Sequence, residues 1–111
     1  MKDIRIAAVI FNSAVGQVQH NLARMLPWIK KAKKEGADLI CFPELNVTGY
    51  STKPEIQDCA ESIPGPISDH LVQMAHENQI VILAGMAEKD EKHLQWNFTL
   101  VIAKHKVTVN Y

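Results

Sequence analysis

Three short apolar runs constrain the fold of this 111-residue chain more than any other feature of its sequence. The runs cover residues 4–11, 39–42 and 80–84, and only Arg5 interrupts the first of them. Nearly unbroken apolar runs of this length are typical of strands that are covered on both faces, for example by helices. We therefore predict three buried strands of one sheet.

Helical periodicity separates the three runs. Apolar residues between 18 and 32 recur three or four positions apart, and Gly36 follows where a left-handed cap would end a helix. Pro27 lies inside this pattern and would remove a hydrogen bond, so we expect a kink or a restart there. A second helix is predicted from Pro66, because proline suits the first helical turn and residues 67–75 repeat the apolar spacing.

The order strand, helix, strand, helix, strand favours parallel strands joined by right-handed crossovers. The end of the chain lacks this alternation of strands and helices. Residues 89–92 are polar, and residues 96–103 and 107–111 are β-rich runs on either side of a short polar segment, which predicts an appended β meander. Because no linker divides the sequence, we expect residues 1–111 to belong to one α/β domain.

Composition argues against several functions. Twelve Lys and Arg residues balance twelve Asp and Glu residues, so no basic face is expected to bind nucleic acid. No apolar stretch approaches the roughly 20 residues that span a bilayer, and no secretory cleavage pattern follows the first run. The two cysteines suggest no disulfide framework, and the five histidines lack metal-ligand spacing. We expect a cytoplasmic protein with no membrane contact, metal or cofactor.

Glu44 is the residue best placed to carry chemistry. It follows the second apolar run directly, and the carboxyl ends of strands in an open α/β sheet border the crevice where ligands bind. The irregular segment 45–66 that comes next is longer than ordinary connections, and such loops usually serve a site. From position alone, however, a solvated carboxylate beside a routine turn is the simpler interpretation.

The residues around Glu44 favour a functional role for it over that simpler interpretation. The string from Phe42 to Tyr50, Phe-Pro-Glu-Leu-Asn-Val-Thr-Gly-Tyr, resembles the glutamate motif of the nitrilase superfamily, the carbon-nitrogen hydrolases. The chain also resembles that family's successive strand segments, in order, at residues 6–9, 36–40, 80–85 and 96–99. The resemblance therefore covers essentially the whole chain.

The resemblance implies a four-layer α-β-β-α sandwich and a catalytic set of glutamate, lysine and cysteine. Glu44 matches the glutamate and would be the general base. The family's lysine would follow soon after Tyr111 and its cysteine farther on, so we expect a truncated, amino-terminal part of the domain that is inactive alone. Tyr50 is a candidate for the wall of the substrate pocket. Asn97 is a candidate for a hydrogen bond to the glutamate loop, or equally an ordinary residue of a β ladder.

Neither cysteine of this chain is expected to replace the missing nucleophile. The reaction needs a thiolate that attacks the substrate carbon and a base that moves protons as the intermediate forms and is cleaved. Cys41 lies in a predicted buried strand, where a thiol is usually inert. Cys59 stands near Asp58 and Glu61, whose carboxylates would raise its pKa rather than lower it.

The leading hypothesis is a hydrolase of non-peptide carbon-nitrogen bonds that acts on a small amide, carbamoyl compound or nitrile, with a homo-oligomer suggested by the resemblance. Two alternatives remain open. A naturally short, non-catalytic module would bind a partner through the exposed edge of an unfinished sheet. A flavodoxin-like ligand binder is weaker, because residues 12–16 hold a single glycine where a phosphate-binding loop would need several.

Overall fold

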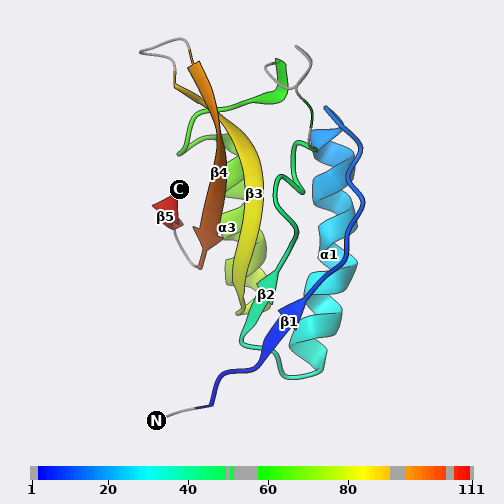
Figure 1. Cartoon of the computed structure of the whole chain (residues 1–111). Coiled ribbons are helices and arrows are strands. Elements are labelled where there is room, and N and C mark those ends of the chain that lie inside the picture. Colours follow the sequence, from blue (N-terminus) through cyan, green and yellow to red (C-terminus); the bar gives the residue numbers. More distant parts are fainter. Residues whose placement is uncertain (1–2, 50, 52–57, 91–94, 105–106, 111) are drawn as a thin grey trace.

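The computed structural model describes residues 3–49, 51, 58–90, 95–104 and 107–110 (Figure 1). In chain order, its elements are β1 (Ile6–Ala8), α1 (Val18–Lys34), β2 (Leu39–Cys41), α3 (Pro66–Asn78), β3 (Val81–Asp90), β4 (Gln95–Ala103) and β5 (Val107–Asn110). The strands form one sheet in the order β1-β2-β3-β4-β5. The α/β fold class predicted from the sequence is therefore confirmed.

The sheet has a parallel part and an antiparallel part. β1, β2 and β3 run parallel, with Ile6 opposite Leu39 and Leu39 opposite Val81. β3, β4 and β5 then pair antiparallel as a meander. Both parts were predicted, although β3 extends to Asp90 and so includes the start of the polar segment expected as a turn. Residues 91 and 92 of that segment lie outside the described residues.

A glycine follows the end of α1, and a proline begins α3. Gly36 takes the left-handed conformation (φ 85°) after α1, and its amide donates a hydrogen bond to the Lys33 carbonyl (3.0 Å), which is the predicted cap. Pro66 opens α3, as predicted. Helix α1 continues through Pro27, so it does not restart there. Pro27 and Ala23 are exposed, so the carbonyl that Pro27 leaves unpaired can bind water.

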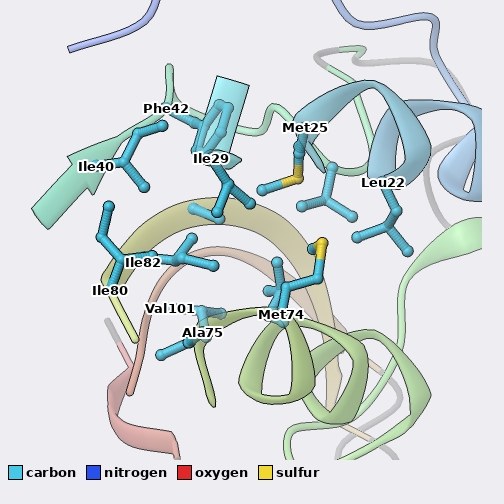
Figure 2. Packing of buried hydrophobic residues seen from close by; sticks show 14 of the residues in the cluster. Leu22, Met25, Ile29, Ile40, Phe42, Met74, Ala75, Ile80, Ile82 and Val101 are labelled. Carbon is cyan, nitrogen blue, oxygen red and sulfur yellow. The ribbon is translucent and has the colours of Figure 1, made fainter. Parts of the chain in front are cut away.

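The hydrophobic core lies between the two helices and one face of the sheet (Figure 2). Its members on α1 and α3 are mostly fully buried and recur at helical spacing. The strands contribute alternate residues, because successive side chains of a strand point to opposite faces. The principal core side chains are Leu22, Met25, Ile29, Leu71 and Met74 from the helices and Ile40, Ile82, Ala84 and Val101 from the sheet.

At β1, β2 and the start of β3, the other face of the sheet is left open by the described residues. Ile6 is 62% exposed, Ala8 is exposed, and Leu39, Cys41 and Leu83 are only half-buried. Among the described residues, helices therefore do not bury the first strand on both faces as predicted: α1 and α3 pack on the same face, and β1 is the short edge strand of the sheet. An unbroken apolar run shows that both faces are apolar, but not what covers each of them.

Candidate active site

Glu44 lies at the carboxyl end of the parallel strands, just past β2. The Phe42 amide still pairs with β3 by donating to the Leu83 carbonyl (2.9 Å), and Pro43, which has no amide hydrogen, then ends the pairing. Residues 44–48 form a turn. The Glu44 side chain is exposed and makes no hydrogen bond or ion pair with another described residue. Its carboxylate oxygens are therefore accessible.

Two side chains of this turn replace β2 along the edge of β3. The Gly85 amide donates to Asn46 Oδ1 (2.9 Å), and the Ala87 amide donates to Thr48 Oγ1 (3.1 Å). Between these bonds, the Val47 amide donates to the Gly85 carbonyl (3.0 Å). All of these residues are buried, so the two side chains satisfy strand amides that would otherwise lose their partners. The turn is thereby fixed against β3.

The backbone of the turn also lies directly on Gly85. A Cβ at this position would stand 2.3 Å from the Leu45 nitrogen and 3.2 Å from the carbonyl carbon of Glu44, so only glycine allows the approach. Leu45 is buried and has a φ of 56°, in the left-handed region that residues other than glycine rarely adopt. Such strain persists only where the surrounding structure enforces it, and it is concentrated at functional sites.

Helix α1 and the segment before it hold the turn from the other side. The fully buried Asn21 donates from Nδ2 to the carbonyls of Val47 (2.9 Å) and Ala14 (2.8 Å), and its Oδ1 accepts from the Ala14 amide (3.1 Å). The Gly16 amide donates to the Thr48 carbonyl (2.9 Å). The turn that carries Glu44 is therefore clamped between α1 and β3.

Asn21, Asn46 and Thr48 were not among the site residues predicted from the sequence. Asn21 did leave a signal, because it lies three residues after Val18 and four before Met25, on the apolar stripe of α1. A polar residue on such a stripe needs a buried partner. Asn46 and Thr48 left no signal, since polar residues are ordinary in turns. Asn46 Nδ2 is buried and has no hydrogen-bond acceptor among the described residues.

The two predicted pocket residues are not placed by the structure. Tyr50 lies outside the described residues. The backbone of Asn97 lies in β4 opposite Glu88, but its side chain is outside the described part of the chain. A contact of Asn97 with the glutamate loop and a pocket wall at Tyr50 both stay predictions.

The pKa of the half-buried Cys59 thiol is raised, as its acidic neighbours indicate. Burial is the largest cause that raises its pKa, the carboxylates of Asp58 and Glu61 add to the rise, and a backbone hydrogen bond opposes it. The predicted direction is confirmed, and a raised pKa disfavours the reactive thiolate. Cys41 is half-buried on the open face of β2 rather than in the core.

Among the described residues, no group of three or more His, Cys, Asp or Glu side chains is arranged to hold a metal ion. In the same part of the chain, no helix has the length and apolar character needed to cross a bilayer.

Sequence comparison relates the chain to enzymes of one family. The model of the carbon-nitrogen hydrolase family matches residues 5–111. A nitrilase from Pyrococcus abyssi is 36% identical over 90 residues, which cover 78% of this chain and 34% of that protein. The omega-amidase NIT2 of Bos taurus is 37% identical over 71 residues, which cover 63% of this chain and 25% of the amidase. The chain thus spans about a third of the nitrilase and a quarter of the amidase.

Structural comparison gives the same result for the fold. The crystal structure of Nit3 from Saccharomyces cerevisiae, a member of branch 10 of the nitrilase superfamily, matches with a TM-score of 0.84 at 23% identity. The match covers 97% of this chain and 43% of Nit3. The helices and sheet described above therefore form part of the α-β-β-α sandwich that the sequence predicted. Because the family model matches nearly the whole sequence, the chain belongs to the carbon-nitrogen hydrolase family.

Proposed function

We propose that this chain is part of a hydrolase of non-peptide carbon-nitrogen bonds in small amides, carbamoyl compounds or nitriles, and that Glu44 is its general base. The observation that carries the proposal is the turn at 44–48, which is clamped from two sides while the Glu44 carboxylate stays accessible. A general base needs both a defined position and an open oxygen. In this proposal residues 1–111 belong to one domain of a cytoplasmic enzyme.

The proposed mechanism uses Glu44 in both halves of the reaction, here written for an amide. Glu44 accepts the proton of a cysteine thiol while the sulfur bonds to the carbonyl carbon, and a lysine cation stabilises the oxyanion. The glutamic acid then gives its proton to the leaving nitrogen, the carbon-nitrogen bond breaks and ammonia departs. Water attacks the thioester as Glu44 takes one of its protons. The carbon-sulfur bond then breaks, and Glu44 returns the proton to the sulfur, which releases the carboxylic acid and restores the thiol and the Glu44 carboxylate.

The lysine and the nucleophilic cysteine of this mechanism are inferred from the family resemblance and would lie beyond Tyr111. A glutamate and a thiol with ordinary pKa values differ by about four units, so proton transfer between them is uphill by roughly 6 kcal/mol. A nearby cation reduces that difference. Because this lysine and this cysteine would lie beyond residue 111, we expect residues 1–111 alone to be inactive.

The test uses a longer form of the protein that includes a lysine and a cysteine after residue 111, assayed for ammonia release from small amides. Glu44→Gln keeps the size of the side chain but removes its basicity, and it should lower kcat by at least about 10²-fold. Glu35→Gln is the matched control, because Glu35 is an exposed glutamate at the end of α1, and it should keep full activity. Unchanged turnover in Glu44→Gln would show that Glu44 is not the base.

A second candidate function, the binding of a protein partner, is favoured by the open face of the sheet. Ile4, Ile6 and Ile10 are 67%, 62% and 99% exposed, and β1 is an edge strand in the described sheet. An unpaired edge beside apolar side chains can pair with another strand. Light scattering on the 111-residue chain tests this function: a stable assembly supports it, whereas a monomer at high concentration that captures no partner counts against it.

A further inference from the structure

We infer that Asn21 of α1 is a positioning residue for Glu44, which rests on the proposed role of Glu44 as general base. Asn21 is fully buried, and both Nδ2 hydrogens and Oδ1 are used in hydrogen bonds. Those bonds join helix α1 to the chain at Ala14, seven residues before Asn21, and to the turn at Val47, 26 residues after it. One side chain therefore couples the helix to the loop that carries the carboxylate.

Val47 is the residue through which this coupling acts. Its carbonyl accepts from Asn21 Nδ2 (2.9 Å), and its amide donates to the Gly85 carbonyl (3.0 Å), so both of its backbone groups are bound. Val47 is also fully buried and lies three residues after Glu44. In the described part of the chain, no other side chain of α1 hydrogen-bonds the turn. Loss of the Asn21 donor would remove the bond between α1 and Val47, while the bonds of the turn to Ser13, to Gly16 and to β3 would remain.

Asn21→Asp separates this positioning role from simple packing, because aspartate has nearly the shape of asparagine. The acceptor for the Ala14 amide is kept, but the donor is replaced by an oxygen that faces the carbonyls of Val47 and Ala14. Asn78→Asp makes the same chemical change elsewhere. Asn78 Nδ2 donates to the Met74 carbonyl (2.9 Å) at the end of α3, so this variant is the matched control.

The first measurement is hydrogen exchange of the 111-residue chain, followed residue by residue. Asn21→Asp should speed exchange of the Val47 and Gly49 amides by at least about tenfold and leave the amides of α3 unchanged. Asn78→Asp should leave the turn unchanged. A uniform increase along the chain would mean a purely structural role, and no increase at the turn would also overturn the inference. If Asn21→Asp does not fold, Asn21→Ser should give a smaller increase with the same local distribution.

The second measurement is the kinetics of the longer, active form. Asn21→Asp should lower kcat by about 10²-fold with little change in KM, because misplacing a catalytic group by about 1 Å costs that much. Asn78→Asp should keep the wild-type kcat. If the wild-type protein releases no ammonia, the proposed function fails, and hydrogen exchange alone decides the positioning of the turn. If the wild type is active but Asn21→Asp keeps both kcat and the protection of Val47, the positioning inference fails and the proposed function stands.

Discussion

Replacing Gly85 with alanine should displace the turn that carries Glu44. The added Cβ would lie 2.3 Å from the Leu45 nitrogen, whereas ordinary van der Waals contact begins at 3.4 Å, so the two backbones must separate by about 1 Å. The atoms it meets belong to the backbone and cannot rotate away. Overpacking of this kind costs about 1–3 kcal/mol of stability, and a shift of about 1 Å at a catalytic group costs about 10² in rate.

Urea denaturation of the 111-residue chain and ammonia release by the longer form would measure the two effects of Gly85→Ala. Gly36→Ala is a suitable control. Gly36 also has a positive φ, so the substitution should cost roughly 1–2 kcal/mol, but its Cβ meets only the flexible end of Arg5 at the other end of β2. It should lower stability without lowering kcat. If Gly85→Ala keeps wild-type stability and kcat, the close contact with the turn has no functional role.

Three further substitutions or reactions probe single features of the structure. Thr48→Val leaves the buried Ala87 amide without an acceptor and should lower the unfolding free energy by about 1–3 kcal/mol in urea, with Thr48→Ser near wild type; an unchanged midpoint would contradict the bond. Pro27→Ala supplies an amide that can donate a hydrogen bond to the Ala23 carbonyl, and it should stabilise the chain by up to about 3 kcal/mol in thermal unfolding. A lower Tm would show that Pro27 does not cost α1 stability. Cys59 should react with iodoacetamide more slowly than an unstructured thiol at pH 8, because its raised pKa leaves less thiolate. The difference in rate should shrink as the pH rises, and equal rates at pH 8 would contradict the raised pKa.

Local signals in the sequence were enough to predict most of the fold. Apolar spacing and the cap at Gly36 identified α1, and Pro66 identified the start of α3, because each of these residues has a strong local preference. The faces of the sheet could not be assigned in the same way. Ile6 belongs to an apolar run yet is 62% exposed, since the cover of a strand depends on where other elements pack rather than on the strand itself.

The candidate site was predictable only in part. The position of Glu44 after a strand followed from the apolar run and from Pro43, and the family motif gave it a role. Nothing in a single sequence shows that Asn21 reaches the carbonyl of Val47, 26 residues away. The positive φ of Leu45 is equally hidden, because leucine has no preference for that conformation and only the tertiary contacts enforce it.

The pH dependence of kcat/KM in the longer, active form tests the central claim most directly, because it reports the protonation state of the base in the free enzyme. If Glu44 is the general base, wild-type kcat/KM should fall toward acid pH, because the reaction needs an unprotonated base. The residual activity of Glu44→Gln should lack that acidic fall, while Glu35→Gln should keep it. An identical acidic fall in Glu44→Gln, with an undiminished plateau, would contradict the account.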